Sequence, residues 1–143
     1  MTFSLDITTR DDLTAAQIAT AREAARAQII AALDNAANEV TGDTPMAERL
    51  SWERKAVAAD AYLQGAASDA QIAMLRAEAE EMQCSIGDLA KVVVGKATAY
   101  AALAARFAGL RQKFTKRIQE AATVHEVKTA YGEFETALTS HKG

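Results

Sequence analysis

Residues 86–121 read IGDLAKVVVGKATAYAALAARFAGLRQKFTKRIQEA, and this stretch decides the fold. It has an apolar residue at every seventh position: Ile86, Val93, Tyr100, Phe107, Phe114 and Ala121. Further apolar residues widen the same stripe: Leu89, Ala90, Ala97, Leu103, Ala104, Leu110 and Ile118. A seven-residue repeat places its members on one face of a helix. The pattern therefore predicts one helix about 50 Å long, at about 1.5 Å per residue.

A second series, of small residues, recurs at the same interval in this segment. Gly95, Ala102 and Gly109 lie roughly 200° around the helix from the apolar stripe, at about 100° per residue. A glycine costs a helix up to about 1 kcal/mol relative to alanine, so the series indicates close approach by a neighbouring backbone. We therefore predict an interface at these three residues. The alternative is a kink or break at Gly95 or Gly109.

Capping signals divide the rest of the chain into further helices. A polar cap with a matching residue three positions later occurs at Ser68 and Gln71, Ser85 and Asp88, and Thr123 and Glu126. Thr44 is predicted as the cap of another helix with Pro45 at its first position, and Gly42 and Gly65 suit helix ends. The predicted helices cover residues 13–40, 45–64, 69–83, 86–121 and 124–139. We expect an all-α fold, a bundle of about five helices with one long central helix.

The predicted helix over residues 45–64 carries two apolar stripes. One contains Leu50, Val57 and Ala61, and the other contains Trp52, Ala56, Ala59 and Leu63. A helix that is apolar on two sides needs cover on both, so this helix is predicted to pack against two neighbours.

The N-terminal stretch TFSLDITTR, residues 2–10, has the alternation of a strand. Phe3, Leu5 and Ile7 alternate with polar residues. We expect a short β-strand or extended arm over residues 1–12, followed by a helical domain over residues 13–143. The chain offers no second clear strand, so we predict that Phe3, Leu5 and Ile7 join a sheet edge on another subunit or protein. The alternative is an arm that packs across the bundle.

Composition and charge restrict the classes of partner. The 143 residues carry a net charge of −3, which creates no general attraction to nucleic acid or to an anionic membrane. The sequence has no cleavable signal peptide and no apolar run of about 20 residues, so we expect no membrane partner and no export by such a signal. A single cysteine, Cys84, fits a reducing compartment.

No group of residues suggests catalysis or cofactor binding. Cys84, His125 and His141 lack partners at the spacing of a nucleophilic set or a metal site. Glycine-rich phosphate loops are also absent. We therefore predict no catalytic residue, no cofactor, no metal site and no enzymatic activity.

Residues 106–117 form a basic stretch without an acidic residue. Its charges belong to Arg106, Arg111, Lys113, Lys116 and Arg117. The intervening aromatic residues belong to the apolar stripe, so docking of an acidic protein or ordinary solvation is the preferred interpretation. The alternative is contact with nucleic acid.

Three segments resemble the small helical domain of bacteriophage tail-fibre and tail-assembly proteins. They are SWERKAVAADAYL at residues 51–63, CSIGDLAKVVVGKATAY at 84–100 and AATVHEV at 121–127, within a match over about residues 50–128. The residues that carry the resemblance are Trp52, Lys55, Ala61, Leu89, Lys96 and Tyr100. Members of that family usually have a different N-terminal portion, often β-rich, so the resemblance leaves open whether this chain is a transient assembly factor or stays in the particle.

The resemblance implies a non-enzymatic structural or assembly protein of the phage tail, in the virion or the host cytoplasm. Its partners would be other tail or fibre proteins, or further copies of this chain. An alternative function from the residues themselves is a small cytoplasmic regulator that binds nucleic acid through residues 106–117.

Overall fold

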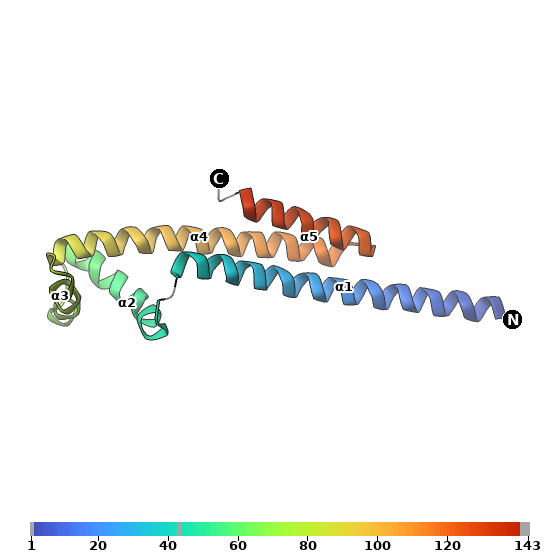
Figure 1. Ribbon diagram of the computed structural model, residues 1–143, viewed down its shortest axis with the longest axis horizontal. Helices are drawn as coiled ribbons and strands as arrows, with labels where there is room; N and C mark the ends of the chain where they lie inside the picture. Colours follow the sequence, from blue (N-terminus) through green and yellow to red (C-terminus); the bar gives the residue numbers. More distant parts are fainter. Residues whose placement is uncertain (1, 43, 141–143) are drawn as a thin grey trace. The chain divides into compact units, whose positions relative to one another are not determined.

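The computed structural model describes the backbone of residues 2–42 and 44–140, and the side chains of residues 14–42 and 44–140. The described backbone is all-helical and contains no strand. Its helices are α1 (Thr2–Thr41), α2 (Met46–Leu63), α3 (Asp69–Met82), α4 (Ile86–Glu120) and α5 (Val124–Thr139), shown in Figure 1. The all-α class and the five expected helices are therefore confirmed.

The strand expected at the N-terminus is not confirmed. The backbone is helical from Thr2, so residues 2–10 extend α1 beyond the expected start at residue 13. A lone strand leaves its backbone N–H and C=O groups without partners, whereas a helix pairs them within the segment. The alanine-rich sequence that follows favours continued helix. The side chains of Phe3, Leu5 and Ile7 lie outside the described residues, so the interface predicted for them stays a prediction.

The helix caps explain most boundaries. Ser68 Oγ accepts a hydrogen bond from Gln71 N at 3.2 Å, and Gln71 Oε1 accepts one from Ser68 N at 2.9 Å, which completes the predicted capping box. Gly65 has the positive φ, 73°, that suits a helix end. The cap predicted at Thr44 is wrong, because the Thr44 hydroxyl donates back to Thr41 O at 2.6 Å and Pro45 occupies the N-cap position of α2.

The long helix α4 is continuous from Ile86 to Glu120, so a break at Gly95 or Gly109 does not occur. Its predicted apolar stripe contributes Val93, Phe114 and, just past its end, Ala121 to the buried core. The residues of α4 up to Ala105 belong to one compact unit of the chain, and those from Arg106 belong to another. Each half of the helix therefore contributes buried residues to the core of its own unit.

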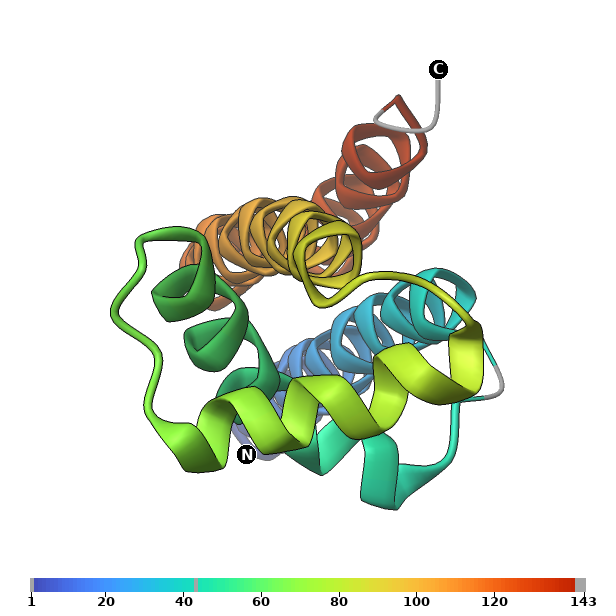
Figure 2. The same ribbon diagram turned by 90° about the vertical axis from the view of Figure 1, so that its left-hand side faces the viewer.

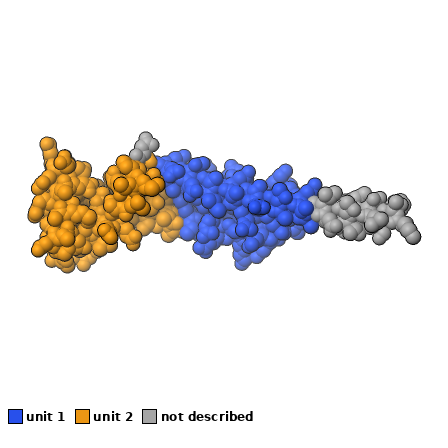
Figure 3. All heavy atoms as spheres, turned by 90° about the horizontal axis from the view of Figure 1, so that it is seen from below, with its two compact units in different colours: residues 1–40, 106–143 blue, residues 41–105 orange. Residues whose placement is uncertain are grey.

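Unit 1 comprises residues 1–40 and 106–143, and unit 2 comprises residues 41–105 (Figure 3). In unit 1, α1, the second half of α4 and α5 enclose one core: Ala25, Ile29, Leu33, Phe114, Ile118, Ala121, Val127, Ala130 and Phe134. Phe114 and Phe134 meet edge to face, with ring centroids 5.7 Å apart, a favourable aromatic arrangement.

Helices α2 and α3 and the first half of α4 belong to unit 2 (Figure 2). They enclose a core of smaller side chains. Its buried members are Ala58, Ala59, Leu75, Ala79, Leu89, Ala90 and Val93. Each alanine buries little apolar area, so this core contributes less hydrophobic free energy than one of large side chains.

Candidate interaction surface

The main candidate site lies on α2 and α3 of unit 2. Helix α2 buries only small side chains, Ala58 and Ala59. Tyr62 packs against the unit 2 core, but Met46, Leu50 and Val57 are 69, 77 and 58% exposed. Helix α2 does contact two neighbours, α3 and α4, as predicted, but Leu50 and Val57 of its first apolar stripe remain more than half exposed.

Six of the ten exposed large apolar side chains in the described residues belong to these two helices. They are Met46, Leu50, Val57 and Leu63 on α2, and Met74 and Met82 on α3. Scattered exposed apolar residues are normal on a protein surface, whereas a concentration of them marks an interaction site.

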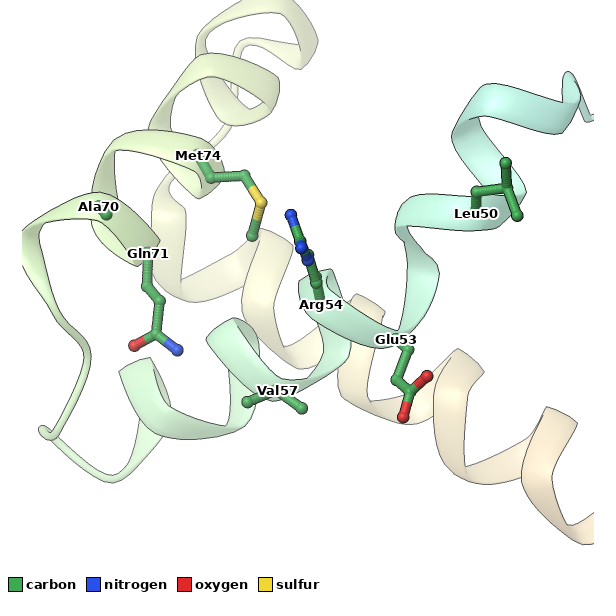
Figure 4. Close-up of a pocket in the computed structure, with 7 residues that line it drawn as sticks. All are labelled: Leu50, Glu53, Arg54, Val57, Ala70, Gln71 and Met74. Atoms are coloured by element: carbon green, nitrogen blue, oxygen red, sulfur yellow. The ribbon is translucent and has the colours of Figure 1, made fainter.

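A groove of about 520 Å³ runs between the two helices (Figure 4). It is lined by Leu50, Glu53, Arg54 and Val57 from α2, and by Ala70, Gln71 and Met74 from α3. The α2 residues follow the spacing of one helical face. Figure 4 shows the Arg54 side chain extending toward Met74. We call these seven residues the α2–α3 groove.

Polar and aromatic contacts hold the helices around the groove. Lys55 Nζ lies 3.2 Å from Glu78 Oε2, and the Lys55 side chain is mostly buried, which protects this ion pair from screening. Trp52 of α2 meets Tyr100 of α4 edge to face, with centroids 5.8 Å apart. Trp52, Lys55 and Tyr100, three of the residues on which the resemblance was predicted, have structural contacts within unit 2.

The small-residue series on α4 faces open space. Gly95, Ala102 and Gly109 are all exposed. A Cβ atom added at Gly95 or at Gly109 would meet no atom within 4 Å. The close backbone approach predicted there is not made by any described residue, and an interface with another chain stays a prediction.

The predicted basic patch, Arg106, Arg111, Lys113, Lys116 and Arg117, is largely occupied by contacts within unit 1. Arg106 Nη2 donates to Ala137 O at 2.9 Å, near the end of α5, where a cation complements the helix dipole. Arg117 pairs with Glu133, and Lys116 Nζ lies 4.0 Å from Glu120 Oε1. Lys113 lies over the Phe114 ring, 5.2 Å from its centroid. Arg111 is exposed.

The Arg117–Glu133 pair also sets the electrostatics of this region. The hydrogen bond from Arg117 holds the pKa of the Glu133 carboxyl below its ordinary value, and the charges of Arg117 and Lys113 add to the effect. In the same unit, burial raises the pKa of the Tyr131 hydroxyl, and the nearby Glu135 carboxylate raises it further.

The single cysteine and the histidine that the structure describes belong to different units of the chain. Cys84 is half-buried and packs against the unit 2 core, whereas His125 is exposed in the first turn of α5. His141 lies outside the described residues. Within the described part of the chain, no three His, Cys, Asp or Glu residues form a group that could hold a metal ion.

The α2–α3 groove was not predicted from the sequence. The sequence does contain an indication of an exposed apolar surface, because Leu50 and Val57 form a second apolar stripe on a helix that already carries one. Periodicity shows that such a stripe needs cover but does not show whether this chain or another protein supplies it.

Comparison with known proteins gives no match: no family model fits the chain, and no curated protein or solved structure is significantly similar to it. Over the described residues, no helix is both long enough and apolar enough to span a membrane.

Proposed function

We propose that this chain is a non-enzymatic interaction module that binds another protein through the α2–α3 groove. The observation that carries the proposal is the exposed apolar lining of that groove by Leu50, Val57 and Met74. Full burial of such a side chain contributes roughly 1.5–3 kcal/mol. These three side chains, together with packing around the rim, would form an apolar cluster at the interface with a partner. A few such residues usually supply most of the binding energy of a protein interface.

The setting we propose is assembly of a phage tail, as a structural or assembly protein in the virion or host cytoplasm. The support is the resemblance of residues 50–128 to the small helical domain of tail-fibre and tail-assembly proteins. The partners proposed from it are other tail or fibre proteins, or further copies of this chain.

Affinity capture from infected cells tests this function. The full chain should recover a tail or fibre protein, and Leu50→Ser should abolish recovery because it replaces an apolar residue of the groove lining with a polar one. The matched control is Ile30→Ser, which changes an exposed apolar residue on α1 and should recover the partner normally. The proposal is wrong if no tail or fibre protein is captured and mass spectrometry finds the chain absent from purified particles.

Binding of nucleic acid through residues 106–117 is the weaker alternative. Arg106, Lys116 and Arg117 already contact backbone or carboxylate groups of unit 1, and phosphate contact would have to compete with those interactions. Salt-dependent retention on an oligonucleotide, lost in a Lys113→Ser, Lys116→Ser, Arg117→Ser variant, would favour the alternative.

A further inference from the structure

We propose that the occupant of the α2–α3 groove is a basic amphipathic helix of the partner protein. This inference rests on the proposed function and adds the class of segment that the groove recognises. Three features of unit 2 lead to it: the composition of the groove, the exposed methionines and the distribution of charge.

The groove is suited to a helix rather than to an extended segment. Side chains of two helices line it, and the described residues contain no strand whose edge could pair with an added strand. An extended peptide in such a groove would leave its own backbone groups without partners, whereas a helix satisfies them internally. Helices bind in grooves of this kind by inserting apolar residues spaced at i, i+4 and i+7.

The methionines of unit 2 add an adaptable contact surface. Met46, Met74 and Met82 are all exposed, although methionine is usually a buried residue. Met74 lines the groove itself. Unbranched, polarisable methionine side chains adjust to ligands of different shape and recur on surfaces that bind amphipathic helices.

The net negative charge of unit 2 favours a basic partner. Residues 41–105 contain nine acidic and six basic residues, a net charge of −3, whereas the rest of the chain contains ten of each. Glu53 lines the groove, and Asp60 and Glu81 are exposed farther along the two helices, seven residues beyond Glu53 and Met74. Arg54 is the one basic residue in the lining. Glu53 and Arg54 offset each other within the lining, so the acidic excess comes from Asp60, Glu81 and the rest of unit 2, and it favours a basic segment over an acidic one.

A second copy of this chain is a poor occupant. Its own basic amphipathic stretch, residues 106–117, has the apolar side chains Phe107, Leu110 and Phe114 packed in or against the unit 1 core. Those side chains are therefore not free to enter a groove. The partner is accordingly a different protein.

Fluorescence anisotropy with the full chain and two designed peptides tests the inference. Both probes are labelled helical peptides about five turns long, with leucines at i, i+4, i+7 and i+11. One carries lysines on its opposite face, and the other carries glutamates at the same positions. The lysine peptide should bind at least about tenfold more tightly than the glutamate peptide, and the difference should shrink as salt is raised from 0.05 to 0.5 M.

Groove variants separate specific binding from general charge attraction. Leu50→Ser, and independently Val57→Ser, should weaken binding of the lysine peptide at least about tenfold, and Ile30→Ser should leave it unchanged. Asp60→Lys combined with Glu81→Lys should weaken it several-fold, and Glu23→Lys on α1 should not. All four replaced groove-side residues are exposed, so each variant should keep its helices, and circular dichroism of each variant checks this.

Three results would overturn the inference. The first is equal or tighter binding of the glutamate peptide, and the second is wild-type binding by both Leu50→Ser and Val57→Ser. The third is loss of self-association, seen by light scattering, as the sole effect of Leu50→Ser, which would make a second copy the occupant. Capture from cells distinguishes failure of this inference from failure of the proposed function. A captured partner that depends on Leu50 but binds through an acidic or extended segment would overturn this inference and leave the proposed function standing. Capture of no partner would overturn both.

Discussion

Two neighbouring isoleucines of α1 show how strongly position decides the energetic role of a residue. Ile29 is fully buried in the unit 1 core, and Ile30 is 53% exposed. Ile29→Ala should lower the free energy of unfolding by about 2–5 kcal/mol, because it removes buried methyl groups and leaves a cavity. Ile30→Ala should change it by no more than about 0.5 kcal/mol. Chemical denaturation of both variants measures the difference, and similar losses would contradict the packing of α1.

Glu133 links the stability of unit 1 to pH. Its pKa is lower in the folded chain than its ordinary value of 4.5, because Arg117 donates a hydrogen bond to the carboxylate. The unfolded chain therefore takes up the proton first as pH falls, so the stabilisation is present above about pH 4.5 and is lost as pH falls toward the folded pKa.

Melting curves of wild type and Glu133→Gln between pH 7 and pH 3 test this link. The variant should melt at a lower temperature at pH 7, and the gap should close at acidic pH. Glu120→Gln is the control, because the Lys116–Glu120 pair is more exposed than the Arg117–Glu133 pair and its atoms are 4.0 Å apart, so it should contribute less. A gap that is constant across the pH range would show that Arg117 does not stabilise the carboxylate.

At the level of helices, the glycines of α4 and of the α1 terminus give opposite predictions. Gly95 lies within α4 with open space where a Cβ would be, so Gly95→Ala should raise the free energy of unfolding by about 1 kcal/mol. Gly42 has a φ of 61°, so Gly42→Ala should lower it by about 1–2 kcal/mol. Thermal denaturation compares the two, and a destabilising Gly95→Ala would reveal a neighbour that the described residues do not provide.

The same position tests the predicted small-residue interface. If Gly95, Ala102 and Gly109 allow another chain to approach closely, Gly95→Leu should reduce self-association measured by light scattering. Gly95→Ala should have a smaller effect because its side chain is smaller. Identical masses for wild type and both variants, at a concentration where wild type associates, would exclude Gly95 from the interface.

Most helices could be predicted from the sequence because their signals are local. Capping at Ser68, Ser85 and Thr123 depends on side chains three residues apart, and these caps form as predicted. The N-terminus was less predictable, because alternation over residues 2–10 favours a strand only if a partner strand exists. The groove could not be predicted, because the spacing of Leu50 and Val57 is the same whether another helix of this chain covers them or leaves them exposed.

Across the entire chain, the two units differ in packing: unit 1 has a core of large side chains, and unit 2 exposes apolar residues. Unit 1 buries large side chains such as Ile29, Ile118 and Phe134, whereas alanines make up much of the unit 2 core and Leu50 and Val57 of α2 remain exposed. Most of the stability is therefore expected from unit 1, and the binding that we propose lies in unit 2. Substitutions in the groove should leave unfolding nearly unchanged, and substitutions in the unit 1 core should not alter the groove.

Site-specific photo-crosslinking in cells that make the full chain tests the binding role of the groove most directly. A photoreactive residue replaces Val57 in one version and Ile30 in another, and adducts are identified by mass spectrometry. We predict a discrete adduct with one partner protein from position 57, lost when Leu50→Ser is added, and none from position 30. No adduct from position 57, or the same adducts from both positions, would contradict a binding groove between α2 and α3.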